Sequence, residues 1–439
     1  MAVSRPHFNP GRVSSQVGWS ATIGSVRGIA VPLWSCALLI SLVYALFSLS
    51  GASQARIWND TYQYTVITEQ DLGHSHTDSQ HLALAFYCGG QADPAACTAA
   101  QTGGVLTPDN PTYDAIFTPR AGVPLLIAAF TPALGPRDAW WLAVTLFAIA
   151  AGLLTLAVLR LLGASPQAAL AGQVLYFILP TGTWAAAFLV DGPVVTTTLL
   201  VIFGALLVLR GRMRLGLALT TLGCAMTFAV KYSQSMLLAG LLLLAVLVAL
   251  VARRGRPRSG LWALAGTSAG ALLLGQVISS LLHLPGLRST LDEQFSGQFR
   301  HPLPAHPYSE LLSAQEPYWW NLLQQQAAGP VLVVGLTVGL WVLWHRERLT
   351  AVVISAVSST GIAAAFIHPT ISQGSRLYVE VYLLPLCGLP LLLDRWTTDA
   401  RSLDAERPLP EAELEPQQQV EQESEQQGRV PCPPGVDPG

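Results

Sequence analysis

Residues 193–252 read PVVTTTLLVIFGALLVLRGRMRLGLALTTLGCAMTFAVKYSQSMLLAGLLLLAVLVALVA, with only short polar interruptions. They form three apolar runs, at about 193–210, 215–231 and 234–252. Each run is close to the roughly 20 residues that a helix needs to cross the hydrocarbon core of a bilayer, whereas soluble cores break such runs at about 10–14 residues. The stretch therefore predicts three consecutive transmembrane helices.

The composition extends this interpretation to most of the chain. Charged residues make up only 11 % of the 439 residues, and the mean hydropathy is +0.44. A soluble domain carries about 25 % charged residues. We therefore expect an all-α, polytopic transmembrane bundle, and no feature of the sequence indicates a nucleic-acid-binding surface.

Further apolar runs bring the expected number of spans to about ten. They lie at about 31–50, 138–160, 166–184, 260–282, 329–345, 349–368 and 378–394. Residues 1–29 are polar and precede a first run without a small-residue cleavage site, which predicts an uncleaved first span. Residues 396–439 are rich in Glu, Gln and Pro, a composition typical of a disordered tail. The membrane domain is thus expected at 30–395.

The distribution of arginine predicts the orientation of the spans. Short arginine-bearing connections mark the cytoplasmic side of a membrane protein. They occur here at 210–214, 253–258 and 346–348, and the N-terminal segment also carries arginine without an acid. The pattern therefore predicts a protein of the cell membrane with both termini in the cytoplasm. Two long loops, 52–137 and 283–328, then face the outside.

Whether the short apolar segment 121–135 crosses the membrane decides on which side the N-terminus lies. It is about 15 residues long and contains Pro124 and Pro132. With the N-terminus inside, the segment must begin and end outside, so we expect a juxtamembrane or re-entrant helix. The alternative is a full crossing, which would place the N-terminus outside.

The long first loop contains two features with possible covalent or metal chemistry. Cys88 and Cys97 are close in sequence and share one compartment, so an oxidising exterior predicts a disulfide between them. His74 and His76 lie near acidic residues and are weak candidates for a divalent metal site, the one cofactor that the sequence leaves open. Two unpaired cysteines and two solvated histidines are the plain alternatives.

Two aspartates are candidate functional residues near the outer surface. Asp60 follows the first span among Trp58, Tyr62 and Tyr64, which suits the interfacial aromatic belt; the alternative is an ordinary loop aspartate. Asp191 interrupts a long apolar stretch, and such residues often mark functional sites. An aspartate before Gly-Pro is equally typical of a helix N-cap.

Three basic residues are also expected on the outer side, although Lys and Arg are usually in excess on the cytoplasmic side. They are Arg120, Lys231 and Arg376. A guanidinium suits bidentate phosphate binding. The alternative for each is a long side chain that only reaches toward the headgroups.

Together these features resemble the GT-C superfamily of membrane glycosyltransferases, which includes the protein mannosyltransferases and the aminoarabinose transferases of lipid A. The resemblance covers about 31–394. It rests on the segments WNDTYQY (58–64), TPRAGVPLLIAAFTPALGPRDAWW (118–141), LPTGTWAAAFLVDGP (179–193) and SRLYVEVYLLPL (375–386).

The resemblance implies a reaction and roles for the candidate residues. A polyprenyl-phosphate sugar would donate its sugar to an acceptor hydroxyl on the outer face, with Asp60 as the general base. Asp191 would help to bind acceptor or donor, and Lys231, Arg376 and Arg120 would hold the lipid phosphate. Many members carry an acidic pair at the first aspartate, whereas Asn59 precedes Asp60 here, which leaves metal dependence open.

A transporter or lipid-handling protein without transferase activity is the rival interpretation. Transporters usually place ionisable residues at mid-membrane and often contain repeats. Here the apolar runs are nearly free of charge, and the polar residues collect on one side. Membrane lipids are the other expected partners, the oligomeric state is left open, and the Ala-, Arg- and Gly-rich composition indicates a high-GC bacterial source.

Overall fold

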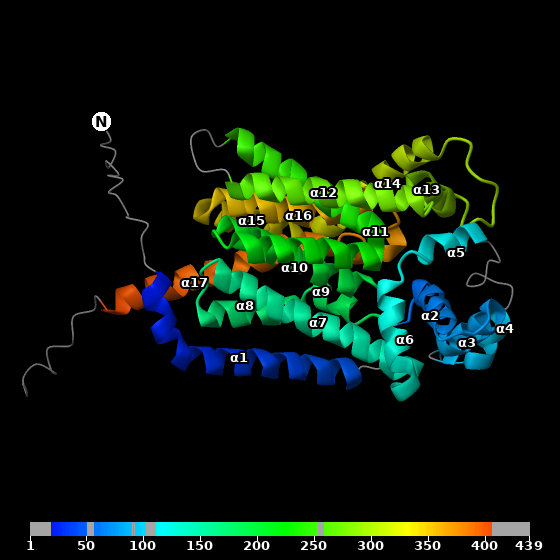
Figure 1. Ribbon diagram of the computed structural model, residues 1–439, viewed down its shortest axis with the longest axis horizontal. Helices are drawn as coiled ribbons and strands as arrows, with labels where there is room; N and C mark the ends of the chain where they lie inside the picture. The colour runs from blue at the N-terminus through cyan, green and yellow to red at the C-terminus, as the bar shows by residue number, and fades with distance from the viewer. Residues whose placement is uncertain are drawn as a thin grey trace, which may run out of the picture. The chain divides into compact units, whose positions relative to one another are not determined.

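The computed structural model describes residues 19–50, 57–89, 91, 93–101, 111–252 and 259–405, and all regular structure within these residues is helical (Figure 1). A first compact unit ends at Leu391. Of the second unit, residues 392–439, only the end of one helix is described. The predicted polar tail beyond 405, most of the N-terminal segment and the arginines at 253–258 lie outside the described residues.

The expected all-α membrane bundle is present. Six of the described helices are long and apolar enough to cross a membrane, and up to eight spans result if each of two bent helix pairs is one span. The predicted count of ten is not confirmed. The six helices are α1 (Trp19–Ser50), α7 (Pro136–Leu161), α10 (Asp191–Leu209), α11 (Met213–Ala252), α12 (Ser259–Leu281) and α16 (Arg348–Ile367).

Helix α11 is broken at Lys231 and folds back on itself. A straight helix of 40 residues would be about 60 Å long, twice the hydrocarbon core. Lys231 instead has non-helical backbone angles (φ −159°, ψ 86°), and the Ser235 hydroxyl donates to the Cys224 carbonyl over 2.9 Å. That contact requires a reversal between the two residues, so α11 has two arms that correspond to the expected runs 215–231 and 234–252.

Two expected spans differ from the prediction. The run 166–184 forms α8 (Pro166–Ile178) and the short α9 (Pro180–Ala185), because Pro180 lacks the N–H that would continue the first helix. The run 378–394 begins as a 3₁₀ turn, η3 (Val379–Tyr382), and becomes α-helical only in α17 (Leu383–Ala405); another 3₁₀ segment, η2 (Ile371–Arg376), precedes it.

Small residues allow close packing of α10 against the first arm of α11. A side chain added at Gly216 would lie 2.7 Å from the Gly204 carbonyl oxygen, and one at Gly204 would lie 2.6 Å from the Thr220 nitrogen. Such contacts are typical of membrane helix pairs, where small residues let backbones approach.

The two ends of the bundle differ in character. At one end Arg210 pairs with Glu347 over 2.9 Å, and Arg346 donates to the Gly163 carbonyl over 2.8 Å. These contacts bring together the connections 210–214 and 346–348, both expected to be cytoplasmic, and the connection between α7 and α8.

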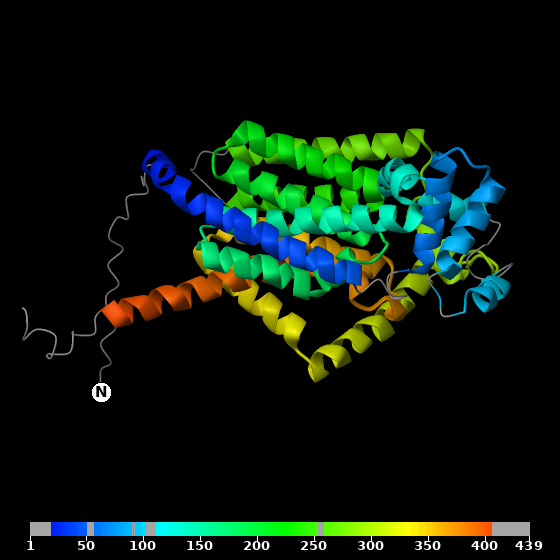
Figure 2. The ribbon, with the colours of Figure 1, turned by 90° about the horizontal axis from the view of Figure 1, so that it is seen from below.

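Shorter helices cover the other end of the bundle (Figures 1 and 2). Helix α6 runs across the end of α7 in Figure 1 rather than along it, in the region where we expect a juxtamembrane segment. The bent pairs are α5 with α6, at 83°, and α14 with α15, at 85°. The short helices of this region are α2 (Asn59–Asp71), α3 (His76–Gly89), α4 (Pro94–Gln101), α5 (Pro111–Phe117), α6 (Gly122–Leu134) and α13 (Leu287–Phe295). The longer α14 (Pro307–Ala328) follows α13 and leads into α15 (Val331–Arg346).

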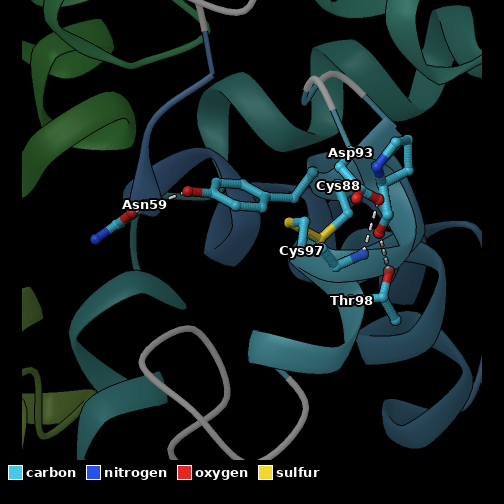
Figure 3. The surroundings of a disulfide bond; sticks show 8 residues. Asn59, Cys88, Asp93, Cys97 and Thr98 are labelled. Carbon is cyan, nitrogen blue, oxygen red and sulfur yellow. Dashed lines mark hydrogen bonds between the residues drawn. A yellow bond between two sulfur atoms is a disulfide. The ribbon is translucent and has the colours of Figure 1, made fainter.

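A disulfide joins two of these short helices. Cys88, near the end of α3, is bonded to Cys97 in α4, with the Sγ atoms 2.08 Å apart (Figure 3). The neighbouring Tyr87 hydroxyl donates to the Asn59 side chain over 3.2 Å. The covalent bond therefore lies one residue from a contact with the start of α2, which carries Asp60.

Candidate active site

All five predicted site residues line one cavity of about 1100 Å³. The cavity lies among α2, the break in α11, the ends of α12 and α16, η2 and α13. The residues come from segments that are far apart in the sequence, and only the fold brings them together. They are Asp60, Arg120, Asp191, Lys231 and Arg376.

Arg376 is the centre of the site because it joins both aspartates. Its Nε donates to Asp191 Oδ2 over 2.7 Å, and its terminal nitrogen pairs with Asp60 Oδ2. Arg376 is only 8 % exposed and Asp191 only 5 %. The buried guanidinium therefore does not reach toward headgroups, and it is occupied by carboxylates rather than held open for a phosphate.

Asp191 lies in the first turn of α10 but does not cap it. The N-cap position is Val190, without a side-chain cap hydrogen bond, and the Asp191 carboxylate turns to Arg376 instead. It also lies 3.9 Å from the Lys231 ammonium. The alternative role of Asp191 as a helix N-cap is therefore not observed.

Helix α2 holds Asp60 at the cavity through buried polar contacts. The Thr61 hydroxyl donates to the Phe188 carbonyl over 2.7 Å, which ties α2 to the segment before α10. Trp140 of α7 donates to the Thr65 hydroxyl over 3.2 Å. As a result Asp60, although it follows the first span in a polar loop, is fixed against the membrane bundle.

The η2 segment is held in a similar way. Gly374 has φ +54° and ψ −136°, a conformation that glycine adopts easily and that turns the chain just before Arg376. Trp184 of α9 donates to the Ser375 hydroxyl over 3.0 Å. These contacts direct Arg376 toward the two aspartates.

Arg120 and Lys231 are the two bases not committed to a close ion pair. Arg120 lies between α5 and α6, where it stacks on Phe117 and donates to the Tyr64 hydroxyl over 3.2 Å. Its Nε is buried and has no hydrogen-bond partner among the described residues. Lys231 occupies the break in α11, and its contact with Asp191 is 3.9 Å long. Both can bind an anion in the cavity.

Three further polar residues line the cavity and were not singled out from the sequence: Glu293, His368 and Glu380. Glu380 is buried and accepts a hydrogen bond from Gln234 over 2.8 Å. An acid within the last apolar run is a signal that could have identified it. Glu293 lies in the polar second loop, where neighbouring acids give no reason to prefer it.

The electrostatics of the cavity keep Asp60 ionised and His368 neutral. Burial opposes the charge on Asp60, but Arg376, Arg120 and Lys231 together hold its pKa below the usual range. Burial lowers the pKa of His368 to about 4, with Lys231 and Arg376 acting in the same direction. At neutral pH the site thus offers a charged Asp60 and an uncharged imidazole.

Apolar side chains line the part of the cavity that extends into the bundle. Gln276 and Leu272 lie one and two turns further into α12 than Ser280, and all three line the same space. The apolar lining is Met236, Leu237, Leu272, Ala364, Ile367 and Leu377. The cavity therefore has a charged head and an apolar extension, which suits an amphiphilic ligand.

The histidines of the first loop do not come together as a metal site. His74 lies 3.5 Å from Glu69, whereas His76 lies 3.9 Å from Asp114. His76 also contacts Gln70 and Gln80 through its two ring nitrogens. Within the described ranges no three His, Cys, Asp or Glu side chains form a group suited to a metal ion.

Comparison of the chain with known protein families gives no matching family model, and comparison with curated proteins gives no match.

Proposed function

We propose that this protein is a membrane glycosyltransferase that moves a sugar from a polyprenyl-phosphate donor to an acceptor hydroxyl outside the cytoplasm. The observation that carries the proposal is the cavity at the end of the bundle. There Arg376 joins Asp60 to Asp191, two further bases line the same space, and an apolar extension leads into the bundle.

The charged end and the apolar end of this cavity suit the phosphate and the isoprenoid chain of the donor, respectively. The lipid phosphate binds Arg120 and Lys231, because each is positively charged and neither is held by a close ion pair. The first isoprenoid units lie along Met236, Leu237 and Leu272. When the sugar leaves, negative charge develops on the phosphate oxygen, and fixed cations at that oxygen lower the barrier.

The acceptor hydroxyl binds next to Asp60. Only one oxygen of Asp60, Oδ2, pairs with Arg376, and Oδ1 has no hydrogen bond to another described residue. Oδ1 can accept a hydrogen bond from the hydroxyl and orient its oxygen toward the anomeric carbon. The resemblance to GT-C enzymes assigns the general base to this aspartate.

The proposal also fixes the side of the membrane. Asp191, at the start of α10, lines the cavity, whereas the ion pair of Arg210 with Glu347 lies at the other end of α10. Because arginine-rich connections are cytoplasmic, the cavity opens to the extracytoplasmic side of a cell membrane. The Cys88–Cys97 disulfide is in keeping with that compartment.

Reconstitution of the full chain in phospholipid vesicles tests this function. Polyprenyl-phosphate monosaccharides with a labelled sugar are supplied one at a time, together with extracted cell-envelope lipids and glycans as acceptors. We expect label in an acceptor with the wild-type chain and none with Asp60→Asn. Release of free sugar alone, or no reaction with any donor, contradicts the proposal. Transmembrane movement of an intact lipid would favour the lipid-handling alternative.

A further inference from the structure

Glu293 differs from the other acids of the cavity in its surroundings. Asp60 and Asp191 are ion-paired with Arg376, and Glu380 is hydrogen-bonded to Gln234. Within the described residues no basic side chain forms an ion pair with Glu293. Glu380 also lacks an ion-paired base, but it is buried, whereas Glu293 is partly exposed and has no such hydrogen-bond partner among the described residues.

The position of α13 places this carboxyl in the cavity that Asp60 and Arg120 also line. Leu291 is fully buried and anchors α13, which packs against α5 and α14. Glu293 lines the same cavity as Asp60, and the charges of Asp60 and Arg120 both act on it. It is also partly accessible to solvent, so a proton bound there has a path to water.

We infer that Glu293, rather than Asp60, takes the proton of the acceptor hydroxyl in the transfer reaction; the inference rests on the proposed function. Asp60, with one oxygen on Arg376, orients the hydroxyl. The acceptor O–H bond breaks and its proton passes to the Glu293 carboxylate. The acceptor oxygen bonds to the anomeric carbon, the bond from that carbon to the phosphate oxygen breaks, and its electron pair leaves with the lipid phosphate.

The titration of Glu293 supports this role. Burial raises the pKa of Glu293 to about 7, Asp60 raises it further, and Arg120 acts in the opposite direction. A general base works best when its pKa lies near the working pH. The pKa of Asp60 is held below its usual range, which makes Asp60 a weaker base.

Other titratable and charged groups face the same cavity as Glu293, among them the buried Glu380. Tyr113 of α5 and Tyr232 of α11 line the cavity with it, and burial raises the pKa of the Tyr113 phenol. His283 and His368 also line the cavity, and His368 is already neutral. The remaining charged or titratable neighbours are Arg288 and Asp292 on its own helix, Arg300 and His301 just after it, and Tyr308 and Glu310 in the first turn of α14.

The test is the pH dependence of sugar transfer by the full chain in vesicles, between about pH 5 and 9. For the wild type we expect kcat to fall on the acid side with one apparent pKa near 7. Glu293→Gln should lower kcat by about 10²–10⁴-fold and remove this acid limb, while the KM for the donor changes less than about threefold. Asp292→Asn, one residue away on α13, should keep the wild-type profile.

A second variant distinguishes the loss of a general base from misfolding of the protein. Glu293→Ala leaves space near the cavity, and added formate should restore part of kcat in proportion to its ionised concentration. A folded Glu293→Gln protein with the wild-type rate and profile, or a Glu293→Ala protein that formate does not rescue, overturns the inference and leaves the proposed function standing. A wild-type chain that is inactive with every donor overturns both.

Discussion

The Nε atom of Arg376 lies 2.7 Å from Oδ2 of Asp191, a residue 185 positions earlier in the chain. Both side chains are buried, and the same guanidinium also holds Asp60. One arginine thus bridges two carboxylates at the end of a membrane bundle and connects α2 to α10.

Replacement of this arginine should destabilise the protein. Arg376→Gln leaves the buried carboxylate of Asp191 and the partly exposed carboxylate of Asp60 without this cation, and breaking a buried pair costs about 3–5 kcal/mol. We expect a lower midpoint of thermal unfolding in detergent and loss of sugar transfer. The double variant Arg376→Gln/Asp191→Asn removes one of the stranded charges and should recover part of the stability but no activity. An Arg376→Gln protein as stable as wild type would contradict the finding that this ion pair is structural.

Removal of either uncommitted base should weaken donor binding. A hydrogen bond to a charged group contributes about 1.5–3 kcal/mol, so Arg120→Gln or Lys231→Gln should raise the apparent Kd for a polyprenyl-phosphate sugar about 10- to 150-fold. Binding is measured by equilibrium partition of labelled donor between protein-containing and empty vesicles.

Arg288→Gln is the matched control for these variants. Arg288 is exposed and pairs with Asp292 on its own helix, so its replacement should leave donor binding unchanged. Equal losses in all three variants would indicate a general effect of charge rather than a phosphate site.

Loss of the disulfide should loosen the outer helices. Cys88 and Cys97 are nine residues apart, and closing a loop of about that length contributes about 2–3 kcal/mol in the chain-entropy model. Cys88→Ser/Cys97→Ser should therefore increase the rate at which added protease cleaves the region of α3 and α4 from the outside. Cys36→Ser is the control because Cys36 is free and lies in α1. Equal cleavage rates in the two variants would show that the bond does not hold this region.

The close contact of α10 with α11 gives a prediction about the bundle itself. A methyl group at Gly216 would lie 2.7 Å from the Gly204 carbonyl oxygen, whereas one at Gly266 of α12 would meet no atom within 4 Å. Overpacking costs about 1–3 kcal/mol, so Gly216→Ala should lower the unfolding midpoint in detergent. Gly266→Ala should leave it unchanged or raise it, since alanine favours the helix by about 1 kcal/mol. The reverse order would contradict the observed packing.

The sequence predicted helices best where the apolar pattern was long and uninterrupted. The runs 138–160, 193–210 and 260–282 correspond closely to α7, α10 and α12. The sequence-based prediction was wrong where an apolar run suggests one continuous helix but the backbone is interrupted. The run at 166–184 is apolar throughout, but Pro180 divides it, and the last run begins in a 3₁₀ turn shortly after Arg376.

The candidate site was predictable only in part, for a related reason. Asp191, Lys231 and Arg376 are visible as charges beside apolar runs, where an ionised group is costly. Glu293 has no such signal, because it lies in a polar loop with several acids and becomes distinctive only through burial and the neighbouring Asp60. The second oxygen of Asp60 and the unpaired Nε of Arg120 are likewise properties of geometry.

Composition and the length of the apolar runs determined by themselves that this chain is an all-helical membrane protein with its candidate polar residues at the ends of the long runs or outside them. Transfer from water to lipid depends on the side chains of one segment at a time, so a linear sequence contains that information. Only the tertiary structure decided that Arg376 pairs with both Asp60 and Asp191 and leaves Arg120 and Lys231 available to a ligand. Which charge meets which depends on contacts between segments distant in the chain, and the free energy of those contacts does not exist until the bundle has packed.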